Sequence, residues 1–86
     1  MTNESTPRIA PGCRLHPTEE VLLIPEGALE LAGPAREILE LTDGQRTVAA
    51  IITELSAQYP DADAAEIGAD VLEMLNGMEE RGVVRA

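Results

Sequence analysis

The residue types that most often carry catalysis or bind metals are scarce in this chain. It has one histidine, His16, and one cysteine, Cys13. His16 stands next to Pro17 in a predicted strand, where a lone histidine is usually a surface or half-buried residue. Cys13 has no second cysteine with which to build a zinc site or an intramolecular disulfide. The sequence therefore predicts no metal site and no catalytic cysteine.

The carboxylates and serines give no better candidate for catalysis. Acid–base chemistry needs two carboxylates in different environments, at least one of them shielded from water. The pairs Glu19–Glu20, Glu37–Glu40 and Glu79–Glu80 fall on predicted turns and outer helix faces, where solvated charge is the better interpretation. Ser56 lies in the middle of a predicted helix, outside any nucleophile elbow or acyl-carrier attachment site. A non-enzyme without a cofactor is predicted.

The charge balance excludes two classes of partner. The 86 residues include sixteen acidic and six basic side chains, all six of them arginine, for a formal net charge of −10. Nucleic-acid binding needs a basic surface that displaces counterions from phosphates, and anionic membranes attract basic segments. This chain has the opposite sign, so partners with basic patches are expected.

The length fits one domain preceded by a short tail. Residues 1–12 are rich in Thr, Ser, Pro and Gly and predict a mobile tail, with Ile9 as the residue that would pin its end to the body. Residues 13–86 then form a single domain. No apolar run approaches the roughly 20 residues that span a bilayer, and the first residues lack the apolar stretch of a signal peptide. A cytosolic location is expected.

Three short strands are predicted between residues 13 and 31. The first covers residues 14–16, and the second is the continuous apolar run of residues 21–24, which is typical of a strand covered on both faces. The turn signal Glu26-Gly27 leads into a third strand that alternates with period 2. Its two faces carry Leu29 and Leu31 on one side, Ala28 and Glu30 on the other. These strands form a small antiparallel meander.

Three helices follow, where the apolar period changes to 3.6. The first begins near Pro34 and ends before Asp43-Gly44. The second runs from Val48 to Tyr59, with Thr47 as its N-cap. The third opens at Asp63, which forms a capping-box pattern with Glu66, and ends at Gly82.

This order of elements predicts an α+β fold, a winged helix-turn-helix with a small N-terminal three-stranded antiparallel sheet followed by three α-helices. Such folds often read DNA with the second helix of the motif. Here that helix, Val48 to Tyr59, carries no Lys or Arg. Its outer face offers no phosphate contacts, so DNA binding is not expected.

The chain has more apolar surface than one core requires. The strand of residues 28–31 is expected at a sheet edge, with unpaired backbone N–H and C=O groups. On the third helix, Leu72 and Ala69 lie off the main apolar stripe, next to Gly68. An edge strand beside a helix groove is a docking surface for an extended peptide that joins the sheet as a further strand. On the residues alone, completion of the core or packing of a homodimer explains this surface equally well.

An ordered set of motifs covers nearly the full length of the chain. In order they are Arg14-Leu15, Val21-Leu22-Leu23-Ile24-Pro25-Glu26-Gly27, Leu29-Glu30-Leu31, Ala35-x-x-Ile38-Leu39, Asp43-Gly44-Gln45-Arg46-Thr47-Val48, Ile51-Ile52-x-x-Leu55, Asp70-Val71-Leu72 and Arg81-Gly82-Val83-Val84. No single motif is decisive, but with these spacings the stretch from Pro7 to Ala86 resembles the pyrroloquinoline quinone biosynthesis protein D family.

The resemblance implies a winged-helix peptide chaperone of the kind called a RiPP recognition element. Members bind the ribosomal precursor peptide whose Glu and Tyr become the quinone, and present it to a radical S-adenosylmethionine enzyme that holds the iron–sulfur clusters. Related domains bind the leader as a strand between the third strand and the third helix. Carried onto this chain, the implied peptide-binding residues are Ala28, Leu29, Glu30, Leu31, Gly68, Ala69, Leu72 and Leu75.

The sequence therefore predicts a cytoplasmic peptide chaperone in quinone cofactor biosynthesis, acting by β-strand addition. Its partners would be the precursor peptide and the radical enzyme, with no nucleic acid and no membrane. The alternative is a winged-helix scaffold that works through dimerisation. Whether the free protein is a monomer or a homodimer is left open at this point.

Overall fold

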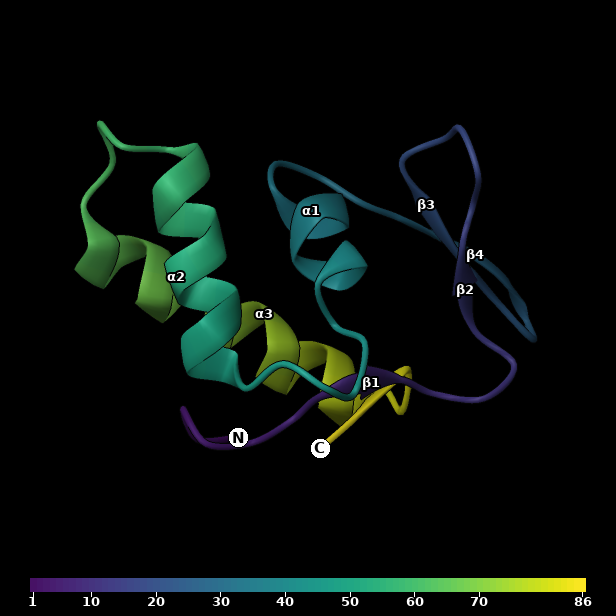
Figure 1. Cartoon of the computed structure of the whole chain (residues 1–86). Coiled ribbons are helices and arrows are strands. Elements are labelled where there is room, and N and C mark those ends of the chain that lie inside the picture. The colour runs from purple at the N-terminus through teal and green to yellow at the C-terminus, as the bar shows by residue number, and fades with distance from the viewer.

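A computed structural model describes all of residues 1–86 (Figure 1). The helices gather on one side and a small sheet stands beside them, while the N- and C-terminal segments run together below. In chain order the elements are β1 (Arg8–Ile9), β2 (Arg14–Leu15), β3 (Val21–Ile24), β4 (Gly27–Glu30), α1 (Ala35–Glu40), α2 (Val48–Gln58), α3 (Ala64–Glu80) and β5 (Val84–Arg85).

The predicted antiparallel meander is confirmed. β2, β3 and β4 form a three-stranded antiparallel sheet in that order, with β3 in the centre. Leu22 on β3 pairs with Leu15 on one side and with Leu29 on the other, and its side chain is fully buried. β4 pairs with β3 alone, so it is an edge strand.

A second sheet joins the two ends of the chain, which the sequence did not predict. β1 pairs antiparallel with β5, with Ile9 opposite Val84. Residues 1–12, predicted to be a mobile tail, lie against the body: the carbonyls of Asn3 and Ser5 accept hydrogen bonds from the first amides of α2, at 3.0 and 2.9 Å. Ile9 does pin the end of this segment, through its pairing with Val84. The mobility of residues 1–12 stays a prediction.

The predicted caps define the helix ends. The hydroxyl of Thr47 accepts a hydrogen bond from the Ala50 N–H at 3.1 Å, and the carboxylate of Asp63 accepts one from the Ala65 N–H at 2.8 Å. Gly82 has φ +79°, a left-handed conformation that glycine adopts without strain. Its N–H donates to the Glu79 carbonyl while the Val83 N–H donates to that of Met78, the Schellman pattern of a helix end.

One aliphatic core holds the sheet and helices together. Twelve buried residues form it, contributed by β3, the segment after β4, all three helices and the C-terminal segment, with no aromatic side chain among them. The fully buried Leu75 of α3 and Ile51 of α2 lie in it beside Leu22 of the sheet. None of the helices is long and apolar enough to cross a membrane.

We expect Thr47→Ala to lower the free energy of unfolding by about 1 kcal/mol, because it leaves the Ala50 amide at the start of α2 without its acceptor. Urea unfolding followed by circular dichroism measures this. The same substitution at Thr53, whose hydroxyl donates to the Ala49 carbonyl in the middle of the helix, is the matched control. It should leave stability unchanged or raise it by up to about 0.7 kcal/mol. Equal losses at both sites would contradict the cap.

Candidate peptide-binding groove

The outer edge of β4 exposes unpaired backbone groups. The Leu31 N–H donates to the Glu20 carbonyl across from it at 2.8 Å. This hydrogen bond fixes which residues of β4 bond to β3 and which ones face outwards. In an antiparallel pair every second residue bonds to the partner strand. Leu29 and Gly27 therefore bond to β3, whereas the N–H and C=O groups of Ala28 and Glu30 point away from the sheet. An added strand would meet two donors and two acceptors there.

A groove runs between β4 and α3, and we call it the β4–α3 groove. On the strand side it is lined by Leu29 and Glu30. On the helix side it is lined by Glu73, Met74, Gly77, Met78 and Arg81. Past the end of β4 it continues along the segment before α1, lined by Ala32, Pro34, Ala35, Ile38, Asp70 and Met74. The C-terminal half of α3 thus borders the groove beside the exposed edge of the sheet.

The strand residues predicted for the site fall in different environments. Ala28 and Glu30 are exposed, and Leu29 is half-buried on the inner face and packs against the core. Leu31 follows the last residue of β4 and belongs to the core, with 9% of its surface exposed. Ala28, Leu29 and Glu30 are therefore the strand residues that an extended ligand can reach.

The helix residues predicted for the site do not line this groove. Leu75 is fully buried in the core. Gly68 faces α2 instead: a Cβ added there would lie 3.6 Å from the Ile52 Cδ1 atom. Leu72 lies about 160° from Met74 around the helix axis, since each residue turns the helix by about 100°. Ala69 shares that far side. The structure brings none of these four residues to the edge of β4.

The groove residues on α3 that sequence reasoning missed are Glu73, Met74, Gly77, Met78 and Arg81. The helical period of residues 67–78 places Met74 and Met78 on the apolar stripe of this helix. Both are only half-buried, because they lie on the flank of the stripe beside β4. Methionine is flexible and common at adaptable binding surfaces, and that was the available signal.

The β4–α3 groove carries more negative than positive charge. Glu30, Glu73 and Asp70 line it with a single base, Arg81. None of these four takes part in the ion pairs of the chain, which join Arg36 to Glu40 and Arg46 to Asp43, or in the His16–Glu19 contact. A ligand with basic side chains would find uncompensated carboxylates here.

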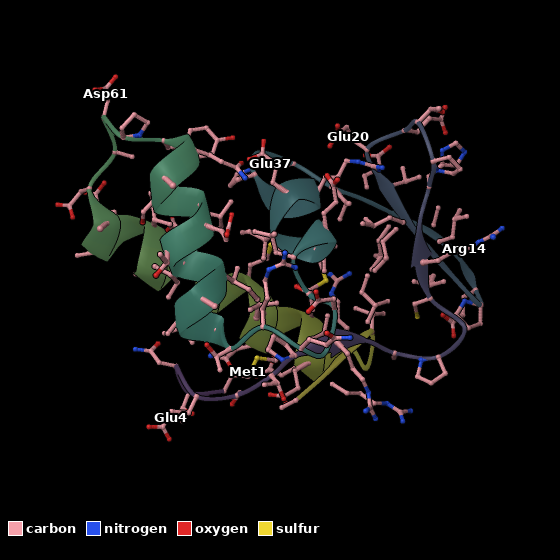
Figure 2. The ribbon with its side chains drawn as sticks, viewed as in Figure 1. Met1, Glu4, Arg14, Glu20, Glu37 and Asp61 are labelled. Atoms are coloured by element: carbon pink, nitrogen blue, oxygen red, sulfur yellow. The ribbon has the colours of Figure 1, made fainter.

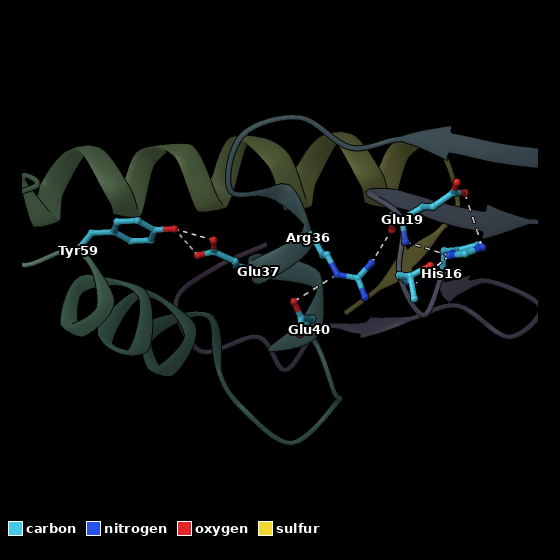
Figure 3. Close-up of polar contacts among 7 residues, drawn as sticks. His16, Glu19, Arg36, Glu37, Glu40 and Tyr59 are labelled. Atoms are coloured by element: carbon cyan, nitrogen blue, oxygen red, sulfur yellow. Dashed lines mark hydrogen bonds and ion pairs between the residues drawn. The ribbon is translucent and has the colours of Figure 1, made fainter.

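Side-chain contacts fix the frame around the groove (Figure 3). The guanidinium of Arg36 on α1 donates to the Glu19 carbonyl at 2.7 Å, which ties the helix to the β2–β3 turn. Within that turn His16 Nδ1 accepts hydrogen bonds from the Thr18 and Glu19 amides, at 3.1 and 3.0 Å. His16 therefore shapes the hairpin. No group of three or more His, Cys, Asp or Glu side chains is placed to hold a metal ion.

Beyond the end of the groove, the hydroxyl of Tyr59 on α2 donates to the Glu37 carboxylate of α1 at 2.6 Å (Figure 3). This hydrogen bond and the nearby negative charge raise the pKa of Tyr59 above its usual value of 10.0. The link holds the ends of the two helices together. It also fixes the orientation of the only aromatic ring in the chain.

The fold places the chain in a class of small α+β recognition domains. It superimposes on the solution NMR structure of a PqqD truncation of Methylobacterium extorquens PqqCD with a TM-score of 0.83 and 37% identity, covering 100% of this chain and 95% of that one. That protein is described as a functional and stand-alone RiPP recognition element.

The family follows from the sequence comparisons. The family model described as coenzyme PQQ synthesis protein D (PqqD) matches residues 19–84. A protein of Xanthomonas axonopodis pv. citri, named PqqA binding protein, is 37% identical over 99% of this chain and 96% of its own length. The chain therefore belongs to the coenzyme PQQ synthesis protein D family.

Some relatives are longer than this chain. A Rhodopseudomonas palustris protein of strain HaA2, also named PqqA binding protein, is 52% identical over 62 residues. The match covers 72% of this chain and 60% of that protein.

We expect Tyr59 to ionise above pH 10, because the folded state favours its protonated form next to Glu37. The stability that this pair contributes is present below pH 10 and is lost as the pH rises through the raised pKa. Ultraviolet absorbance of the phenolate during a base titration reports this residue alone. Glu37→Ala should return the pKa towards 10.0, and an unchanged titration in that variant would contradict the link.

Proposed function

We propose that this protein is a peptide chaperone that binds the ribosomal precursor peptide of pyrroloquinoline quinone biosynthesis as an added strand on β4. The observation that carries the proposal is the free edge of Ala28 and Glu30 beside the half-apolar β4–α3 groove. The names of the relatives, PqqA binding proteins, support the same ligand. We also propose that the fold is a winged helix-turn-helix.

Backbone pairing and side-chain contacts would contribute to peptide recognition in different ways. Hydrogen bonds to Ala28 and Glu30 would each contribute roughly 0.5–1.5 kcal/mol and tolerate many peptide sequences. Alternate side chains of the peptide would point into the groove against Leu29, Met74 and Met78. An affinity near micromolar, about −8 kcal/mol, suits a carrier that must release its cargo.

Delivery to a radical S-adenosylmethionine enzyme completes the proposal. The cofactor and the bond-forming chemistry belong to that enzyme, and this chain contributes binding and presentation. Glu4, Glu20 and Asp61 lie at separate points of the surface, and Figure 2 has Glu4 and Asp61 projecting away from the body. Such outward carboxylates are the surface available to a basic partner. The site of contact with the enzyme is part of the proposal.

Ala28→Pro tests strand addition. Proline removes the outward N–H of Ala28, which makes no bond to β3, so the sheet should keep its stability. The Kd for the precursor peptide, measured by calorimetry, should weaken about two- to tenfold, the value of one backbone hydrogen bond.

Ala28→Val is the matched control, because it changes the side chain and keeps the N–H. Its Kd should stay within about twofold of the unchanged protein. Equal affinity in both variants would contradict pairing at this edge. A chain that binds no peptide and instead forms a dimer that Ala28→Pro dissociates would support the dimerisation scaffold.

A further inference from the structure

A second hollow lies past the end of the β4–α3 groove, where the three helices meet. It encloses about 360 Å³, and five of its eight lining residues are hydrophobic. Leu55 and Tyr59 of α2 and Ile67 of α3 form its walls, and Gly33 and Pro34 form one rim. This volume lies at the low end of the range for ligand pockets, roughly 300–1,000 Å³, which suits one large side chain.

This hollow is continuous with the β4–α3 groove. Pro34, Ile38 and Asp70 line both the hollow and the extension of the groove past β4. Met74 lines that extension and the groove beside β4. An extended chain lying on β4 can therefore run on along α3 and reach the hollow without crossing another element.

The charges around the hollow indicate which kind of peptide segment would bind there. The walls are apolar, but Asp70 stands at the rim and has no ion-pair partner. The Glu37 carboxylate lies at the hydroxyl end of the Tyr59 ring and accepts a hydrogen bond from it. Farther along the groove, Glu30 and Glu73 add negative charge. An acidic neighbour of the apolar side chain would be repelled, and a Lys or Arg would be attracted.

We propose that this hollow, which we call the anchor pocket, takes one large apolar side chain of the bound peptide, with a Lys or Arg of the same peptide against Asp70. The inference rests on the proposed function and adds a specificity site outside the strand-pairing edge. The side chain in the anchor pocket would belong to a peptide residue that flanks the strand-paired stretch and forms no hydrogen bond with β4.

The direction of the chain sets which side of the paired stretch carries the anchor. β4 runs from Gly27 to Glu30 and then continues through residues 31–34 towards the anchor pocket. A peptide that pairs antiparallel with β4, the slightly more stable arrangement, runs the opposite way. Its N-terminal part therefore lies over the pocket. The anchor therefore precedes the residue of the peptide that lies opposite Glu30.

The first experiment replaces each large apolar residue of a synthetic PqqA precursor peptide by alanine in turn. One residue on the N-terminal side of the paired stretch should weaken the Kd at least about tenfold, the effect of leaving one large apolar side chain unburied. Replacing the adjacent Lys or Arg by Glu should also weaken binding, and this loss should shrink at high salt.

Tyr59 supplies the direct readout, since it is the only aromatic residue of the chain. With carbon-labelled protein and unlabelled peptide, the only other ring signals are those of the His16 imidazole, which have different carbon shifts. We expect intermolecular nuclear Overhauser effects between the Tyr59 ring or the Ile67 methyls and the anchor side chain. The anchor→Ala peptide should lose them.

Matched variants on α3 distinguish the loss of the anchor pocket from a general loss of folding. Ile67→Glu places a charge in the pocket, and Leu72→Glu places one on the far side of the same helix; both positions are half-buried aliphatic residues. The first should weaken the Kd at least about tenfold and the second less than about threefold. If Ile67→Glu fails to fold, Asp70→Asn is used instead, and it should weaken only peptides that keep the basic neighbour.

The possible outcomes test the anchor pocket and the proposed function separately. Peptide binding that perturbs the β4 amides but leaves Tyr59 and Ile67 unchanged would overturn the anchor pocket and leave the proposed function standing. Pocket signals that change with protein concentration in the absence of peptide would mean that a second copy fills it, which also overturns the inference. Absence of any saturable binding would overturn both proposals.

Discussion

A strand at the edge of a sheet leaves backbone donors and acceptors without partners, and this constraint governs the molecule. β4 pairs on one side only, so Ala28 and Glu30 present their N–H and C=O groups outwards. Such an edge is an aggregation hazard unless it is short, charged or covered. Here it is four residues long, carries Glu30 and faces a groove. The same features that limit unwanted pairing also suit the proposed binding of one extended ligand.

The third helix serves the core and the groove with different faces. Val71 and Leu75 are buried against the sheet and α2, in a core without aromatic side chains. The flank with Met74 and Gly77 stays open beside β4. Because a domain of 86 residues has little apolar surface to spare, its helix caps and terminal strands add to a modest stability. The candidate site therefore stands on a frame held by the shared core together with these contacts.

Local patterns in the sequence predicted most of the fold. The run of residues 21–24, the alternation after Gly27 and the caps Thr47, Asp63 and Gly82 each act within a few residues, so their outcome can be read from the chain. The β1–β5 sheet joins residues more than seventy positions apart, and neither two-residue strand has a period of its own. No local rule predicts such a pair.

Sequence patterns place residues on the strand side of the groove but not on its helix side, for a similar reason. Alternation alone assigns Ala28 and Glu30 to one face of β4. Periodicity on α3 gives the width of the apolar stripe, but not which of its two flanks borders the sheet. That choice depends on how the helix packs, and the packing turns Gly68 towards Ile52 and leaves Met74 at the edge of β4.

The most direct test of strand addition compares backbone amides along β4 in nitrogen-labelled protein titrated with the precursor peptide. The account predicts saturable shifts and new protection from hydrogen exchange at Ala28 and Glu30, whose amides face outwards. Gly27 and Leu29, already bonded to β3, should keep their protection. Binding with unprotected Ala28 and Glu30 amides would contradict pairing at this edge and place the peptide elsewhere on the domain.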